Sequence, residues 1–145
     1  MNLQAISQLN EAQVQDLQRL YQSAWWSKER QLDEIRRMVA GSDLIVGECQ
    51  AETGRLISFA RVLTDFVYRA LILDVIVDEA FRNQGLGRRL MEQIVHHPQL
   101  QSVEALLLFC EAEMVPFYRK WGFQDDLYTL KLMGRMQPKP DAARG

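Results

Sequence analysis

The 145-residue sequence has few cysteines, no long apolar run and no excess of charge of either sign. The two cysteines, Cys49 and Cys110, lie far apart without C-x-x-C spacing, which indicates core residues in a reducing compartment and excludes a redox or zinc motif. No apolar run approaches the roughly 18 residues that cross a bilayer, which argues against a membrane protein. A formal net charge of −2 disfavours a general binder of nucleic acids. Any phosphate site must therefore be local.

The N-terminal residues lack the basic region and apolar core of a signal peptide, so we expect a cytoplasmic protein. The length suffices for one domain with a core of its own. The last nine residues are proline-rich and polar, with nothing to bury. We therefore predict a single domain over residues 1–136 and a flexible tail over residues 137–145.

Apolar spacing predicts helices and strands that alternate along most of the chain. Asn10 and Gln13 can form a capping box at the start of the first helix. The predicted helices span residues 11–24, 32–39, 86–97 and 117–121. The predicted strands span residues 44–50, 56–63, 71–77, 104–110 and 127–133. This order predicts the α/β class, with one mixed sheet and helices packed on it.

The strand at residues 71–77 leads directly into a glycine-rich turn, "RNQGLG", and then into a helix. Backbone N–H groups at such a helix start, together with the helix dipole, favour an anion. Gly85 and Gly87 leave room for close approach, and Arg82, Arg88 and Arg89 add positive charge. The turn therefore predicts a phosphate site, although a plain turn with surface arginines would have the same sequence.

Two common phosphate motifs do not fit this turn. A Walker A loop requires Gly-Lys-Ser/Thr, whereas Gly87 is followed by two arginines. A dinucleotide fingerprint requires a third small residue where the sequence has Leu90, and it usually opens a domain. The spacing that does fit is Arg-x-x-Gly-x-Gly, at Arg82, Gly85 and Gly87.

A second motif, Phe117-Tyr118-Arg119-Lys120-Trp121-Gly122-Phe123, follows one helix and one strand later. In this order, the two motifs resemble the GNAT superfamily of N-acetyltransferases, and the resemblance covers residues 3–133. The segments "SFARVLTD", "LILDVIVDEAFRNQGLG" and "LFCEAEMVPFYRKWGF" are most similar to a bacterial and plastid branch with serotonin N-acetyltransferase-like members.

The resemblance implies a mostly antiparallel central sheet flanked by helices. It implies an acetyl-CoA-dependent N-acetyltransferase, which transfers acetyl to a primary amine by direct attack in a ternary complex. It also implies that the central strand splays from the next one, so that its backbone binds pantetheine while the turn binds the diphosphate. The implied acetyl-CoA contacts are Val75, Ile76, Val77, Arg82, Asn83, Gln84, Gly85, Leu86, Gly87 and Arg88.

Tyr118 matches the family tyrosine that protonates the departing CoA thiolate, although a packed aromatic is the plain alternative. Asp74 lies in an apolar strand, where a carboxylate is costly unless it is paired or used. Asp74 is therefore a candidate general base or acceptor-orienting residue, with a structural role as the alternative. Glu111 and Glu113 are weaker candidates for the base, and they stand where the family often has an asparagine.

The resemblance places the acceptor between the first helices and the loops beside the central strands. The candidate acceptor residues are Trp25, Trp26, Phe66 and Tyr68, with acidic Glu29, Asp33 and Asp65 nearby in sequence. Aromatic and acidic groups suit a primary amine, although at least one tryptophan is expected to pack the helices on the sheet. His96 and His97 complete no ligand set, so we predict no metal.

The expected partner is a small-molecule amine or a protein amine, with no nucleic acid and no membrane. A non-catalytic acyl-CoA-binding regulatory module is the alternative function. The sequence leaves open the acceptor, the general base, the use of other acyl groups, and whether the chain forms a homodimer.

Overall fold

A computed structural model describes residues 2–138, which divide into two compact units, one ending at Cys110 and the other beginning at Glu111. The first unit holds one sheet with the strand order β1-β2-β3-β4-β5. The strands are β1 (Leu3–Ile6), β2 (Leu44–Gln50), β3 (Leu56–Thr64), β4 (Arg69–Val77) and β5 (Ala105–Leu108). The first four pair antiparallel and β5 runs parallel to β4, which confirms the mostly antiparallel sheet. The short edge strand β1 was not predicted from the sequence.

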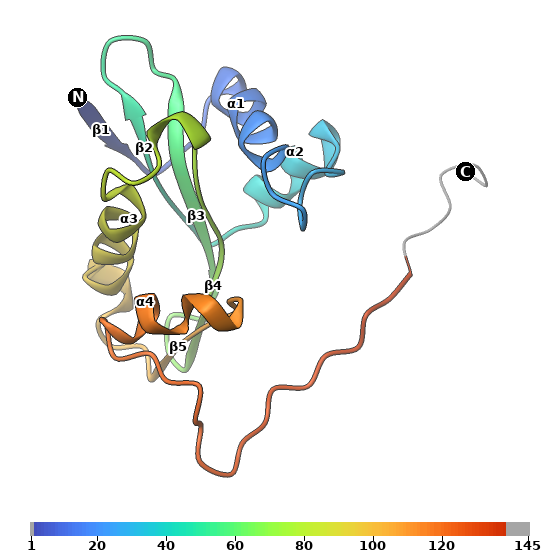
Figure 1. Cartoon of the computed structure of the whole chain (residues 1–145), viewed down its shortest axis with the longest axis vertical. Helices are drawn as coiled ribbons and strands as arrows, with labels where there is room; N and C mark the ends of the chain where they lie inside the picture. Colours follow the sequence, from blue (N-terminus) through green and yellow to red (C-terminus); the bar gives the residue numbers. More distant parts are fainter. Residues whose placement is uncertain (1, 139–145) are drawn as a thin grey trace. The chain divides into compact units, whose positions relative to one another are not determined.

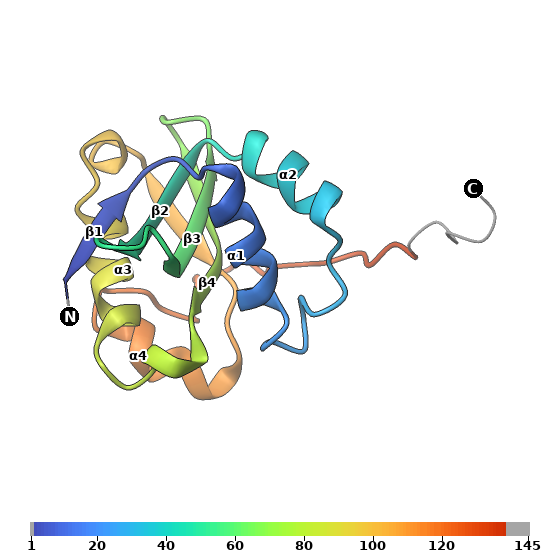
Figure 2. The same cartoon turned by 90° about the horizontal axis from the view of Figure 1, so that it is seen from above.

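Three helices flank this sheet: α1 (Glu11–Tyr21), α2 (Leu32–Ala40) and α3 (Leu86–Val95). Helices α1 and α2 lie on one face and α3 on the other (Figures 1 and 2). The capping box is confirmed, because Asn10 accepts from the Gln13 N–H at 2.8 Å and donates its own N–H to Gln13 at 3.0 Å. Short 3₁₀ turns, η1 (Glu79–Phe81) and η2 (Pro98–Leu100), flank α3.

The core of this unit lies on both faces of the sheet. Beneath α1 and α2, Leu17, Tyr21, Ile35 and Phe59 are fully buried in one apolar cluster. Helix α3 buries Leu86, Leu90, Met91 and Ile94, the apolar face that its spacing predicts. The helices on the two faces keep water from the middle strands, so those strands can hold polar groups in fixed positions.

Strand β4 departs from regular pairing at two places. Phe59 pairs with Ile76 and Arg61 pairs with Leu73, so Asp74 and Val75 together face only Ala60. This is a β-bulge, and Asp74 takes a left-handed φ of 59°. Pairing with β5 ends at Ile72, whereas β4 continues to Val77. Among the described residues, no strand pairs with the β5-side edge of residues 73–77, as the resemblance implies.

The second unit contains η3 (Ala112–Met114) and α4 (Val115–Arg119), with Pro116 in the first turn as predicted. The predicted strand at residues 127–133 is wrong, because these residues form no strand in the part of the chain described. Tyr128, Leu130 and Leu132 are exposed there. Alternating apolar residues favour a strand only where a neighbouring strand supplies hydrogen bonds, which sequence spacing does not specify. Most of the predicted tail, residues 139–145, lies outside the described range.

Candidate active site

The glycine turn forms a backbone cradle at the start of α3. Asn83 and Gly85 have left-handed φ values of 63° and 81°. The first helical hydrogen bond joins the Arg89 N–H to the Gly85 carbonyl at 3.1 Å, so the N–H groups of residues 86–88 precede the ladder. A Cβ at Gly85 would meet nothing within 4 Å, so the left-handed φ, and not a lack of space, favours glycine there. The cradle suits an anion such as a diphosphate.

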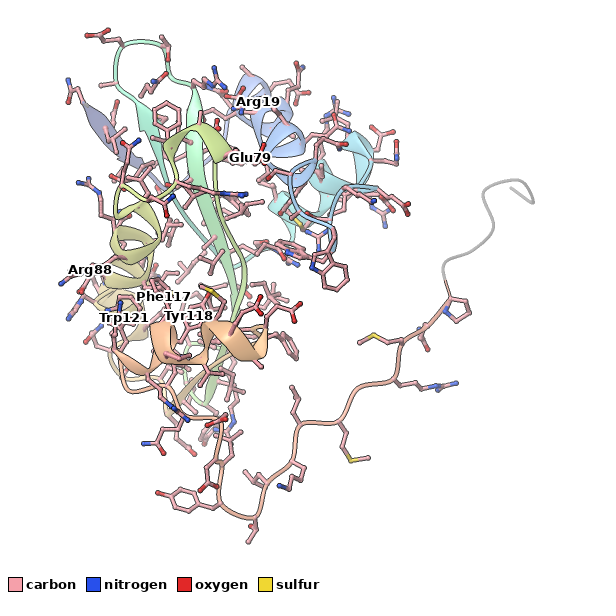
Figure 3. All side chains as sticks on the ribbon, viewed as in Figure 1. Arg19, Glu79, Arg88, Phe117, Tyr118 and Trp121 are labelled. Atoms are coloured by element: carbon pink, nitrogen blue, oxygen red, sulfur yellow. The ribbon has the colours of Figure 1, made fainter. Side chains whose placement is uncertain are left out.

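Asp78 fixes the chain between β4 and this cradle. Its carboxylate accepts from the Ala80 N–H at 2.9 Å, from Arg19 of α1 at 2.6 Å and from Arg55 at 3.4 Å. Figure 3 shows Arg19 on α1 near Glu79, which follows Asp78. Burial alone would raise the pKa of Asp78, but the hydrogen bonds from Ala80 and Arg19 outweigh it and lower that pKa. The turn is therefore anchored before any ligand binds.

The three arginines of the turn have different surroundings. Arg89 donates two hydrogen bonds to Glu48 of β2, a fully buried carboxylate, so its charge is already paired. Arg82 donates to the Val77 carbonyl at 3.3 Å and to the Ser23 hydroxyl at 3.1 Å. Arg88 points away from the sheet on α3 (Figure 3). Neither Arg82 nor Arg88 pairs with a carboxylate among residues 2–138, so both are available to a phosphate.

Asp74 lies at the centre of a charged cluster at the β4 bulge. Its Oδ2 accepts from the Tyr21 hydroxyl at 2.9 Å, from Arg30 at 2.7 Å and from Arg61 at 2.8 Å. The Asp74 side chain is only 7% exposed. Burial by itself would raise the pKa of Asp74, but hydrogen bonds and charges from Arg30 and Arg61 lower it below the ordinary value. A carboxylate held ionised by two arginines is poorly suited to accepting a proton.

The four candidate acceptor aromatics lie in two places within the first unit. Trp26 packs edge-on against Tyr21, with ring centroids 6.0 Å apart, whereas Trp25 is 74% exposed. Phe66 and Tyr68 lie in the β3–β4 turn, which Asp65 organises by accepting the N–H groups of residues 67–69. No ring contact within residues 2–138 joins the two places. The structure therefore groups Trp26 with Asp74 but not with Phe66 or Tyr68.

Tyr118 lies in α4 of the second unit, within a small aromatic group. Its ring centroid is 5.0 Å from that of Phe117 and 6.4 Å from that of Phe123. The ring centroid of Phe117 is also 5.0 Å from that of Trp121, which follows α4 (Figure 3). The second motif thus forms a local aromatic cluster around the tyrosine. Its catalytic role stays a prediction.

The partners of Asp74 were not predicted from the sequence; they are Tyr21, Arg30 and Arg61. The signal for Arg61 was present, because it interrupts the apolar strand "LISFARVL" and a buried charge requires an opposite charge. Cys110 is exposed, contrary to prediction, while Cys49 is buried. Residues 2–138 contain no helix long and apolar enough to cross a membrane.

Residues 40–125 match the acetyltransferase (GNAT) domain family. The chain is 34% identical over 118 residues to serotonin N-acetyltransferase 2, chloroplastic, of Oryza sativa subsp. japonica, covering 80% of this chain and 52% of that protein. It is 31% identical over 129 residues to histone acetyltransferase TAP1 of Glycine max, covering 83% of this chain and 55% of that protein. A solved structure from Xanthomonas campestris pv. campestris, described as belonging to the GNAT family, has a TM-score of 0.81 at 27% identity and 95% coverage of both chains.

The chain therefore belongs to the GNAT family of acetyltransferases, the class whose cosubstrate is acetyl-CoA. The relatives agree with the serotonin N-acetyltransferase-like branch that the sequence indicated. The chain spans about half the length of the two plant relatives. The cradle at α3 fits the diphosphate of acetyl-CoA, because its backbone N–H groups and the exposed Arg88 present positive charge at one helix end.

Proposed function

We propose that this protein transfers the acetyl group of acetyl-CoA to a primary amine by direct attack in a ternary complex. The observation that carries the proposal is the unpaired edge of β4 at residues 73–77, which leads into the left-handed cradle at Gly85. The cradle residues 82–88 hold the diphosphate, and the backbone of Val75, Ile76 and Val77 holds the pantetheine arm. This arrangement aims the thioester along β4.

The bonds that change are few. The neutral amine nitrogen forms a bond to the thioester carbonyl carbon, and the C–S bond breaks. The nitrogen, which is positively charged after the attack, loses one proton, and the departing thiolate gains one. In the proposed reaction, a β4 backbone N–H near Val75 stabilises the charge on the carbonyl oxygen, and Tyr118 protonates the thiolate. For Asp74, its three donors and lowered pKa argue against the role of general base.

The acceptor is a primary amine on a small molecule or on a protein. The names of the two plant relatives point to both kinds, because one refers to serotonin and the other to histones. We propose no nucleic-acid or membrane partner. We also propose action in the cytoplasm, where acetyl-CoA and a reduced Cys110 are compatible.

The test combines binding and turnover in the purified chain. Calorimetry should show CoA binding, and free thiol should appear when acetyl-CoA is mixed with one amine of a panel of arylalkylamines, polyamines, aminosugar phosphates and lysine peptides. Binding of CoA without thiol release from any amine would instead support the non-catalytic acyl-CoA-binding module. Absence of CoA binding would contradict both functions.

A further inference from the structure

The loop between α1 and α2, residues 22–31, contacts β4 through one half-buried side chain, that of Arg30. Arg30 donates to Oδ2 of Asp74 at 2.7 Å. Its guanidinium carbon also lies 4.7 Å from the Tyr21 ring centroid and 5.4 Å from the Trp26 ring centroid. One carboxylate and two aromatic faces therefore hold the same cation, which is a stronger attachment than a surface ion pair.

The group that Arg30 binds is conformationally costly. Asp74 has a left-handed φ of 59° within the bulge, a backbone conformation that costs free energy for a non-glycine residue. Such a conformation persists only where its surroundings fix it. Arg61 fixes Asp74 from β3, within the sheet, whereas Arg30 fixes it from a loop without regular secondary structure.

The same loop also contacts the glycine turn that follows β4. The Ser23 hydroxyl, near the start of the loop, accepts from Arg82 of the glycine turn at 3.1 Å. The loop is therefore attached near each end, to the turn after β4 and to the bulge within it. Trp25 and Trp26, two of the candidate acceptor residues, lie between these attachments.

We infer that Arg30 is a positioning residue that couples the acceptor loop, residues 22–31, to the β4 bulge through Asp74. The kinetic part of this inference rests on the proposed function. When Arg30 is seated, the loop holds Trp26 beside Tyr21, and the bulge holds Val75 in the conformation that faces the thioester.

The position of Arg30 also affects which amine acceptors are favoured near Asp74. The aromatic faces and the carboxylate that could bind an ammonium are already filled by Arg30, and the cluster contains two positive groups for one negative group. An amine near Asp74 therefore meets a net positive charge, which favours its neutral, nucleophilic form. Polycationic acceptors are disfavoured at this point for the same reason.

The test is chemical rescue of Arg30→Ala by ethylguanidinium, which can refill the space between Tyr21, Trp26 and Asp74. We expect kcat/KM for the amine to fall by about 10- to 100-fold in Arg30→Ala, with the calorimetric Kd for CoA changed much less. Millimolar ethylguanidinium should restore part of the loss saturably. The matched control is Arg36→Ala, which removes an exposed arginine paired with Glu11 and Asp33. Its kcat/KM should match that of the wild type, and ethylguanidinium should not alter it.

A second readout does not depend on turnover. In a Trp25→Phe, Trp121→Phe background, Trp26 is the single tryptophan, and its emission should shift in Arg30→Ala and return with ethylguanidinium. If the chain binds CoA but acetylates no amine, the proposed function fails, while this titration still tests the coupling. Should Arg30→Ala not fold, Arg30→Lys keeps the charge but loses the planar stacking, and its Trp26 emission should shift in the same direction.

Two results would overturn the inference. One is an Arg30→Ala protein whose kinetics and Trp26 emission match those of Arg36→Ala. The other is a loss that ethylguanidinium leaves unchanged in both readouts, which would show that Arg30 acts only through overall stability.

Discussion

Tyr118 is the residue that we propose to protonate the departing thiolate. Its ring is fixed between Phe117 and Phe123, so Tyr118→Phe should keep the packing and remove only the hydroxyl. We expect kcat to fall by about 100-fold, because a positioned general acid contributes at least that much. Steady-state thiol release measured from about pH 6 to 9 tests this. Unchanged turnover across that range would remove Tyr118 from the mechanism.

The ion pairs of Asp74 lead to a prediction about the free energy of unfolding and its dependence on pH. Asp74→Asn leaves Arg30 and Arg61 without their carboxylate, and should lower the free energy of unfolding by about 3 kcal/mol near pH 7. The folded pKa of Asp74 lies below the unfolded value of about 3.9. The stabilisation is therefore complete above the unfolded pKa and is lost as the pH falls through the folded pKa.

Urea denaturation of the wild type and Asp74→Asn across a pH series measures this difference. It should be constant from about pH 5 to 8 and shrink in acid. A difference that changes near neutral pH would indicate a raised pKa, as a general base requires. Asparagine also tolerates the left-handed conformation, so the backbone cost is nearly the same in both proteins.

At the scale of elements, the start of α3 depends on the conformation of Gly85. Gly85→Ala should lower the free energy of unfolding by about 1 kcal/mol, because φ is 81° there, and should weaken CoA binding about 10-fold. Gly54→Ala is the matched control, since Gly54 has φ of 76° and open space like Gly85 but lies in the β2–β3 turn. Equal losses of CoA affinity, measured by calorimetry, would exclude the cradle as the binding site.

Two adjacent arginines of α3 should separate binding from stability. Arg89→Met leaves the buried Glu48 unpaired and should cost about 3 kcal/mol of unfolding free energy. Arg88→Met should change stability by less than about 0.5 kcal/mol but weaken CoA binding, most clearly at low salt. Denaturant titration and calorimetry on both variants test this. The opposite assignment of effects would mean that Arg89, not Arg88, meets the phosphates.

For the whole molecule, ligand binding should be visible as thermal stability. CoA at about 100 times its Kd contributes about 2.7 kcal/mol, which should raise the Tm by several degrees. Pantetheine, which lacks the diphosphate, should raise it much less at the same concentration, because it reaches β4 but not the cradle. A thermal shift assay with both ligands measures the difference, and equal shifts would place the binding energy away from residues 82–88.

The sequence predicted interactions between residues close together in the chain and failed where an element depends on a distant partner. The capping box at Asn10 and the turn at Gly85 involve residues within four positions of one another, so their spacing alone predicted them. The strand predicted at residues 127–133 required a partner strand, and spacing could not supply one. The short strand β1 lacks a long apolar pattern, and it forms because β2 supplies a pairing partner that the local sequence does not reveal.

The sequence by itself determined the order of elements from α1 to α4, the glycine turn and the aromatic motif around Tyr118, because each is encoded in neighbouring residues. Only the tertiary structure decided that Arg89 pairs with Glu48 and that Tyr21, Arg30 and Arg61 converge on Asp74. These partners are 41, 53, 44 and 13 residues apart in the chain. A buried charge demands some opposite charge, and only the folded sheet and loop select which one.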